Sequence, residues 1–269
     1  MGKNVAKLKL YHNDMSSCSQ KVRLLLEEKK LEWIGKHLDL RKGETRTKEY
    51  INKLNKNGVV PTLVYGNDIV IESTIIMEYL EDEFPKVSLR PIKSNDIARM
   101  RLLNKKIDDT LHSAIAIISS CIAFRHQFIE KYNTEEINKL IEMIPDKKRR
   151  DISKDTIFKG LESTYLPNAL DEYLKVFDKL DKHLSQYEWL AGDNYSLADI
   201  SYTPYLTRFE HLDLSFMFKE RQNLSNWFSK IKQRENYKQA ILDWNNKKYL
   251  TLMYKKGSDA YSKIAKIIS

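Results

Sequence analysis

Cysteine, glycine and proline are scarce in this sequence of 269 residues, with 2, 8 and 6 copies respectively. The two cysteines, Cys18 and Cys121, are too few for a disulfide framework, and neither stands in a metal-binding spacing. The six histidines are scattered and form no HExxH motif. With a hydrophobic fraction of 42%, the composition is typical of a globular chain, for which we expect no metal site.

Long apolar runs are also missing. The run Ile115-Ala-Ile-Ile118 is typical, and it is far shorter than the ~20 residues of a membrane span. Residues 1–9 alternate lysine with apolar residues and lack the apolar core of a signal peptide. We therefore expect a cytoplasmic protein without a membrane partner.

Charge is plentiful, and its balance is basic, with a net charge of +9. The basic residues are spread along the chain, and the densest run, Lys147-Lys-Arg-Arg150, has no aromatic residues or binding motif beside it. This pattern predicts a solvated basic surface and no nucleic-acid partner.

The first part of the chain alternates strand and helix patterns. Residues 7–11 alternate polar and apolar side chains, as in a strand, and Val22, Leu25 and Leu26 set a helical face that ends near Lys30. The pattern then predicts a strand over 33–40, a hairpin over 61–71 that turns at Gly66, and a helix from 73 that stops at Phe84-Pro85. This order predicts an α/β thioredoxin-like domain over residues 1–86.

The remainder carries only helical patterns. Apolar residues recur at helical spacing over 95–132, and a polar stretch, 145–155, is expected to interrupt the helices. Further helices are predicted over 166–186, 196–209, 223–233 and 236–245. Strands and helices followed by helices alone indicate two domains, with an all-α domain over residues 94–269.

The segment from Tyr11 to Arg23 joins a strand to a helix through a serine-rich loop that contains Ser16, Ser17, Cys18 and Ser19. A serine there caps the helix in the simplest interpretation. A hydroxyl at a helix N-terminus can also donate to another molecule's thiolate, since both the helix dipole and the hydrogen bond favour the anion. Both interpretations stay open.

Two further elements have the same double meaning. Val60-Pro61 can be a strand start, or a cis bond that presents the Val60 backbone to a peptide-like ligand. Glu72-Ser73 can cap a helix, or the carboxylate can hold a ligand ammonium while the hydroxyl and helix N–H groups hold a carboxylate. Together they suit glutathione, which has a thiol, a peptide middle and an amino-acid end.

These segments resemble the cytosolic glutathione transferases. The resemblance rests on Leu10-Tyr11, the serine-rich loop, Lys21-Val22-Arg23, Asn55-x-x-Gly58-Val-Val-Pro61 and Glu72-Ser73, and it covers residues 8–85. The stretches Glu72–Pro85 and Ser88–Pro91, and the insert around 144–150, are similar to the bacterial β-etherase branch of the family. The resemblance implies a glutathione transferase fold, glutathione as co-substrate and a homodimer.

The resemblance also implies site residues. Aligned on Lys21-Val22, the family serine falls at Ser16, whereas the etherase-like pattern places it at Ser19, with Ser17 and Cys18 between. Val60, Pro61, Glu72 and Ser73 would bind glutathione. By position alone, the second substrate would meet His12, Met15, His112, Ile115 and Ser119. Lys56 replaces the usual proline after Asn55, which we expect to leave that loop intact.

The sequence thus predicts a glutathione transferase, whose bound thiolate attacks an electrophilic carbon of an apolar or aromatic compound in detoxification or β-ether cleavage. One alternative is a non-catalytic binding or scaffold protein with this fold. Another is a glutathione-dependent thiol oxidoreductase that uses Cys18. In the helical half, Ser196-Leu-Ala-Asp199 resembles the family's capping box and is expected to be structural.

Overall fold

The computed structural model describes residues 7–269; residues 1–6, with which the predicted first domain begins, lie outside the described part. The chain divides into two compact units. Unit 1 comprises Met1–Arg90 and Arg234–Asn245, and unit 2 comprises Pro91–Gln233 and Asn246–Ser269. The segment Arg234–Asn245, which the sequence predicts to lie in the all-α domain, therefore groups with the first unit.

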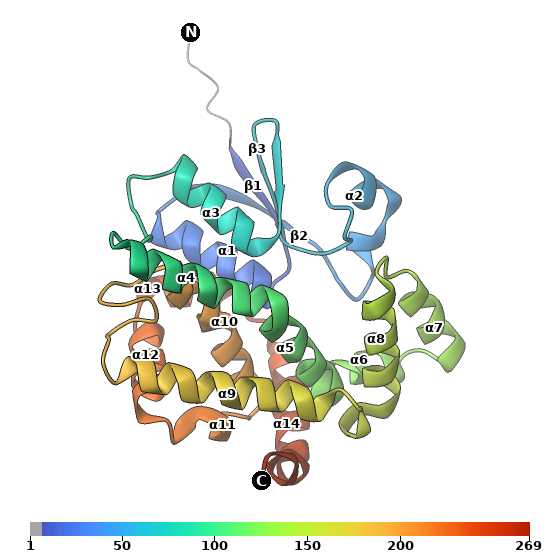
Figure 1. The fold of residues 1–269 in the computed structure, drawn as a ribbon. Coiled ribbons are helices and arrows are strands. Elements are labelled where there is room, and N and C mark those ends of the chain that lie inside the picture. The colour runs from blue at the N-terminus through green and yellow to red at the C-terminus, as the bar shows by residue number, and fades with distance from the viewer. Residues whose placement is uncertain (1–6) are drawn as a thin grey trace. The chain divides into compact units, whose positions relative to one another are not determined.

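Unit 1 is built on a four-stranded sheet in the order β2-β1-β3-β4 (Figure 1). β1 pairs in parallel with β2 and antiparallel with β3, and β3 pairs antiparallel with β4. The strands are β1 (Leu8–His12), β2 (Trp33–His37), β3 (Thr62–Tyr65) and β4 (Asp68–Ile71), and the helices are α1 (Ser17–Glu28), α2 (Lys48–Lys53) and α3 (Ser73–Glu83). This is the predicted thioredoxin-like arrangement.

The core of unit 1 follows from the alternation in β1. Leu8 and Leu10 are buried, while Lys9 and Tyr11 between them are half-buried. Leu25 of α1 and Leu63 of β3 have no exposed surface, so both elements turn an apolar face inward. β2 is shorter than the predicted strand 33–40 and ends at His37.

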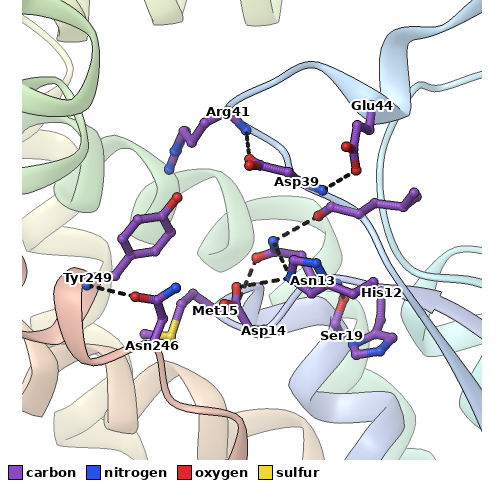
Figure 2. Close-up of polar contacts among 12 residues, drawn as sticks. His12, Asn13, Asp14, Met15, Ser19, Asp39, Arg41, Glu44, Asn246 and Tyr249 are labelled. Carbon is purple, nitrogen blue, oxygen red and sulfur yellow. Dashed lines mark hydrogen bonds and ion pairs between the residues drawn. The ribbon is translucent and has the colours of Figure 1, made fainter. Parts of the chain in front are cut away.

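The early end of β2 has a local cause. The N–H of Asp39 donates to Oε2 of Glu44 at 2.7 Å, and Oδ1 of Asp39 accepts from the N–H of Arg41 at 2.8 Å (Figure 2). These bonds use backbone groups that a longer strand would need for its ladder. The chain after Leu38 therefore folds into a loop.

Unit 2 contains only helices among the described residues. Four predicted helices are present: the long stretch Ser94–Phe124, α9 (Leu166–Leu184), α10 (Leu197–His211) and α12 (Gln222–Lys232). The long stretch consists of α4 (Ser94–Lys106), a π-helical segment Ile107–Leu111, α5 (His112–Ser119) and a second π-helical segment Ser120–Phe124. It ends sooner than the predicted 95–132, and α6 (His126–Ile129) follows. α11 (Phe216–Lys219) and α14 (Lys247–Ile268) lie later in the unit, and α14 was not predicted.

The expected polar interruption over 145–155 is wrong. Those residues largely form α8 (Lys147–Lys159), whose N-cap Asp146 accepts from the N–H of Arg149 at 2.7 Å. α7 (Thr134–Glu142) precedes it and begins with a capping box of Asn133 and Glu136. The caps satisfy N–H groups that a charged run would otherwise leave to water, and Ile137, Ile141 and Ile157 form a small core under both helices.

Two helices of unit 1 that lie late in the sequence, α13 (Glu235–Ala240) and the short 3₁₀ helix Leu242–Trp244, occupy the predicted helix 236–245. Arg234, just before α13, binds the carboxylate of Glu28 in α1 with two hydrogen bonds of 2.9 and 2.7 Å. This bidentate pair anchors the late segment on the first helix of the domain.

The stretch Ser94–Phe124 is, by length and composition alone, long and apolar enough to cross a membrane. More than half of its most apolar part is buried inside the structure. Core helices of soluble proteins pass the same test, so this feature is weak support for a membrane span.

The predicted capping box of α10 is confirmed. Oδ2 of Asp199 accepts from the N–H of Ser196 at 2.9 Å and from its hydroxyl at 3.0 Å, and the Ser196 side chain accepts from Ala198. Oδ1 of Asp199 accepts from the N–H of Leu190 and from the indole of Trp227. Burial raises the pKa of Asp199 to about 6, against the four hydrogen bonds that lower it. The pair is therefore a structural element inside the core.

Candidate functional site

Ser16 is the N-cap of α1 and is half-buried. Its side-chain oxygen accepts from the N–H of Ser19 at 3.3 Å. A cap uses a lone pair of the hydroxyl and leaves its hydrogen available to donate. The capping and thiolate-stabilising interpretations of Ser16 are therefore compatible, since they use different parts of one hydroxyl.

The three neighbours of Ser16 differ in access. Ser19 has no exposed surface, and its hydroxyl accepts from the N–H of Asn13 at 3.2 Å. Ser17 is 6% exposed, while Cys18 is half-buried at the second position of the helix. Among the four candidates, Ser16 and Cys18 are thus the ones with appreciable surface.

Asn13 organises the loop between β1 and α1. Its Oδ1 accepts from the N–H of Met15 at 3.1 Å, and its Nδ2 donates to the carbonyl of Leu38 at 3.0 Å (Figure 2). Together with the bond to Ser19, these contacts tie the loop to the first turn of α1 and to the end of β2. The loop that presents Ser16 is therefore held from two sides.

The second element of the site is the turn before β3. The Val60–Pro61 peptide bond is cis, and Val60 is 7% exposed. The amide of Asn55 and the hydroxyl of Tyr50 both donate to the carbonyl of Val59, at 3.1 and 2.8 Å. These two hydrogen bonds hold the loop in its conformation, although Lys56 stands where the family usually has proline.

The third element is the start of α3. Glu72 occupies the N-cap position, but its side chain makes no capping hydrogen bond, and its φ is 69°. Its Oε1 instead accepts from the amide of Asn57 at 2.9 Å. Ser73, the first helical residue, is 5% exposed. The capping interpretation of Glu72 is not realised, and positive φ at a non-glycine residue is a kind of strain that clusters at ligand sites.

Two residues that were expected in the second-substrate pocket, His12 and Met15, belong to unit 1 and are buried. Met15 is 4% exposed and His12 has no exposed surface. The His12 ring lies edge-on to Trp33 and Trp244, with ring centroids 5.5 and 4.7 Å away. Burial and the nearby Arg23 cation lower the pKa of His12 to about 3. His12 is therefore neutral, and direct contact with a substrate would require its ring to be uncovered.

The other three pocket candidates lie on α5 in unit 2. His112 is exposed and its Nδ1 lies 3.4 Å from the hydroxyl of Tyr205. Ile115 is 2% exposed, and the fully buried hydroxyl of Ser119 accepts from the guanidinium of Arg208 at 3.3 Å. A π-helical segment adjoins α5 at each end, a departure from the α-helix that is frequent at functional sites. Among these three residues, only His112 has an exposed side chain.

Sequence analysis missed two residues of this site, Asn13 and Arg23. Arg23 was recognised only as part of a motif, yet it is fully buried and bonds to the backbone of the same loop. An arginine on the buried face of an amphipathic helix was the available signal. Across residues 7–269, no group of three or more His, Cys, Asp or Glu residues is placed to hold a metal ion.

Known families and proteins match this chain in both halves of its sequence. The glutathione S-transferase N-terminal domain family matches residues 15–83, and the C-terminal domain family matches residues 150–235. Glutathione S-transferase 1 of Dianthus caryophyllus is 32% identical over 198 residues, with 74% of this chain and 75% of that protein covered. The tetrachloro-p-hydroquinone reductive dehalogenase of Sphingobium chlorophenolicum is 28% identical, with 86% and 94% covered.

A solved structure completes the comparison. The β-etherase LigF from Sphingobium sp. strain SYK-6 superposes with a TM-score of 0.79 and 26% identity, over 87% of this chain and 98% of that one. A small α/β unit with a four-stranded sheet, followed in the sequence by a helical unit, is the architecture of the glutathione transferases. The chain belongs to the glutathione S-transferase family, and the predicted resemblance to the family and to its β-etherase branch is confirmed.

Proposed function

We propose that this transferase binds glutathione on unit 1 with Ser16 as the donor to its thiolate. The glutathione sulfur attacks an electrophilic carbon, a C–S bond forms, and the leaving halide or aryloxide departs with the electron pair of the broken bond. The thiol proton passes to solvent before attack. Ser16 stays neutral throughout, since its hydroxyl donates to the anion and does not itself ionise.

The single observation that carries this role is the geometry of Ser16. Its oxygen is engaged as a helix cap, its hydrogen is available, and it is half-buried at the positive end of α1. Ser19 accepts a bond from inside the protein and has no exposed surface. The structure thus supports Ser16 over the etherase-like alternative Ser19.

The test is the pH–rate profile of Ser16→Ala beside those of Ser17→Ala, Cys18→Ala and Ser19→Ala. Without the Ser16 hydroxyl, the pKa of the bound thiol should return toward about 8.5. Turnover at mildly acidic pH should then fall by about ten-fold or more, while glutathione affinity changes little. An unchanged profile for Ser16→Ala with a shifted one for Ser19→Ala would reverse the assignment.

For the amino-acid end of glutathione, we assign Glu72 to the ammonium and Ser73 with the first N–H groups of α3 to the carboxylate, while the Val60 backbone pairs with the peptide middle. Glu72→Gln keeps the acceptor for Asn57 but removes the charge. It should weaken binding by about 1.5–3 kcal/mol in calorimetry. Glu83→Ala, at the exposed opposite end of α3, is the matched control and should leave the dissociation constant unchanged.

The electrophile is proposed to be apolar and aromatic, and to meet residues of α5, with His112 offering the exposed polar group. Relatives include a reductive dehalogenase of a chlorinated hydroquinone and a β-etherase, so aryl halides and β-aryl ethers are the substrates to test first. Glutathione-dependent turnover of any of these compounds would also separate the enzyme from a non-catalytic binding protein, which would bind glutathione and turn over none.

A second candidate function is thiol exchange at Cys18, which the partial exposure of this cysteine at the helix N-terminus favours. The Cys18 thiolate would attack the glutathione sulfur of a mixed disulfide and displace the other thiol. A second glutathione would then release glutathione disulfide and regenerate Cys18. Loss of disulfide reduction in Cys18→Ser, with aryl transfer retained, would establish this activity beside the first.

We further propose a homodimer in the cytoplasm, with a role in detoxification. Ile69 of β4 and Ile75 of α3 are 48% and 56% exposed, and such apolar side chains on the hairpin and the next helix suit a subunit interface. Sedimentation of the wild type against Ile75→Glu tests the dimer. A dimeric wild type that becomes monomeric on substitution is the expected result, and a wild-type monomer would overturn it.

A further inference from the structure

Arg23 lies on the inner face of α1 and has no exposed surface. Its Nη1 donates to the carbonyl of Asn13 at 3.0 Å and lies 3.2 Å from Nδ1 of His12, and its Nη2 donates to the carbonyl of Asp14 at 2.9 Å. One guanidinium therefore contacts the last residue of β1 and the first two residues of the loop that leads to Ser16.

The same guanidinium also binds the late segment Arg234–Asn245. Its Nε donates to the carbonyl of Ala240 at 2.8 Å, and its Cζ lies 5.1 Å from the ring centroid of Trp244. Trp244 in turn covers the ring of His12. Arg23 thus joins two backbone segments that are more than two hundred residues apart, and both lie in unit 1.

The charges around Arg23 keep this arrangement intact at neutral pH. Burial lowers the pKa of Arg23 to about 9, with Asp14 and Glu27 acting in the opposite direction, so the guanidinium remains protonated. His12 is neutral and accepts through Nδ1, which assigns the proton to Nε2. His37 adds a partly exposed imidazole 3.5 Å from Oδ1 of Asp14. A fixed cation with planar donors is suited to holding several carbonyl groups at once.

From these contacts we infer that Arg23 is a positioning residue for the transfer reaction. It links the segment Arg234–Asn245 to the loop before α1, and so holds the Ser16 hydroxyl at hydrogen-bonding distance from the glutathione sulfur. The inference rests on the proposed role of Ser16. Arg23 is buried and touches no reacting atom, so it acts through the loop. Loss of its fixed geometry would let the loop shift by fractions of an ångström, enough to weaken a hydrogen bond to the thiolate.

Arg23→Lys tests the inference, because lysine keeps the charge but cannot reproduce the planar set of donors. The readout is the pKa of glutathione bound to the purified full-length protein, followed by the ultraviolet absorbance of its thiolate during a pH titration. We expect the pKa of the bound thiol to rise. At pH values below the wild-type pKa, the thiolate fraction should fall about ten-fold. The dissociation constant of glutathione should stay within about three-fold of the wild type.

A second pair of variants separates positioning from folding. Trp244→Phe is a milder change in the late segment and should shift the same thiol pKa in the same direction. Ser196→Ala should lower the melting temperature through the other unit and leave the thiol pKa unchanged. If Arg23→Lys and Trp244→Phe lower the melting temperature as Ser196→Ala does but leave the thiol pKa at the wild-type value, Arg23 is only structural and the inference is overturned.

The wild type and Ser16→Ala distinguish this inference from the proposed function. If the wild type binds glutathione without lowering its thiol pKa, or if Ser16→Ala leaves that pKa unchanged, the role of Ser16 is wrong and the coupling to it falls as well. If Ser16→Ala raises the thiol pKa and Arg23→Lys does not, the role of Ser16 stands and only the role of Arg23 is excluded.

Discussion

The ammonium of Lys29 lies 2.8 Å from Oε2 of Glu81, and both side chains are at least 97% buried. Lys29 also donates to the carbonyls of Phe84 and Val87, and Oε1 of Glu81 accepts from the N–H of Leu89. The pair therefore joins the end of α1 to α3 and fixes the chain that leaves the thioredoxin-like unit.

Removing one partner of this pair should be costly. Glu81→Ala leaves the Lys29 charge buried without its carboxylate, and we expect unfolding in denaturant to show a loss of about 3–5 kcal/mol. Glu49→Ala removes a carboxylate from the exposed pair with Lys53 and is the control, with a change within about 0.5 kcal/mol. Equal effects of the two substitutions would contradict the importance of the buried pair.

The capping box of α10 gives a second prediction about stability. Ser196→Ala should cost about 0.5–2 kcal/mol through loss of the cap. Asp199→Ala, which leaves the indole of Trp227 and backbone N–H groups without an acceptor, should cost about 3 kcal/mol or more. Thermal unfolding measures both. Loss of turnover in either variant at unchanged melting would show that the pair acts in catalysis.

Acid should destabilise unit 1 through His12. The folded pKa of this histidine is about 3, whereas an unfolded histidine has a pKa near 6.5, so unfolding takes up a proton between these values. The contribution of neutral His12 to the free energy of unfolding is therefore fully present above about pH 6.5. It is lost as the pH falls, and the loss should reach about 2 kcal/mol by about pH 5. His12→Gln should reduce the acid loss by that amount.

Two other histidines complete this test. His112→Gln, at an exposed position, is the control for replacing a histidine and should change the free energy of unfolding at neutral pH by no more than about 0.5 kcal/mol. Burial also lowers the pKa of His211 to about 3, so His12→Gln should retain a residual acid loss from unit 2. A pH dependence of unfolding identical in His12→Gln and the wild type would contradict the role of His12.

A fourth prediction concerns the last helix. Gly257 of α14 lies so close to the carbonyl of Leu212 that an added Cβ would collide with it. Gly257→Ala should therefore push α14 off its packing surface and lower the melting temperature, at a cost of about 1–3 kcal/mol. Ser258→Ala, on the exposed side of the same helix, should be neutral. A Gly257→Ala variant that melts like the wild type would mean that α14 packs differently.

Local signals account for what the sequence predicted correctly. The alternation in β1, the turn at Gly66 and the stop at Phe84-Pro85 each depend on a few neighbouring residues, and together they define the thioredoxin-like unit. Ser16 could be placed at a helix start for the same reason. The helix α8 could not be predicted in the same way, because its many positive charges leave few apolar residues at helical spacing, and its start becomes evident only when Asp146 is recognised as a cap.

Features that depend on distant residues escaped prediction. The buried positions Met253, Gly257, Ala260 and Ile264 of α14 recur at helical spacing, but two of them are small and give a weak apolar signal. The bond from Arg23 to Ala240 spans 217 positions, and no local pattern connects the two. The uncapped, positive-φ conformation of Glu72 is likewise set by its surroundings.

The late segment Arg234–Asn245 also constrains the order in which the chain can mature on the ribosome. A thioredoxin-like unit encoded in one continuous stretch could be finished soon after residue 90 emerges, whereas this one needs a piece that is translated much later. At ordinary elongation rates the delay is on the order of ten to thirty seconds. During that time Arg23 lacks the carbonyl of Ala240 and Glu28 lacks the guanidinium of Arg234, so a nascent chain released before residue 234 would carry charged side chains on its first helix without these partners.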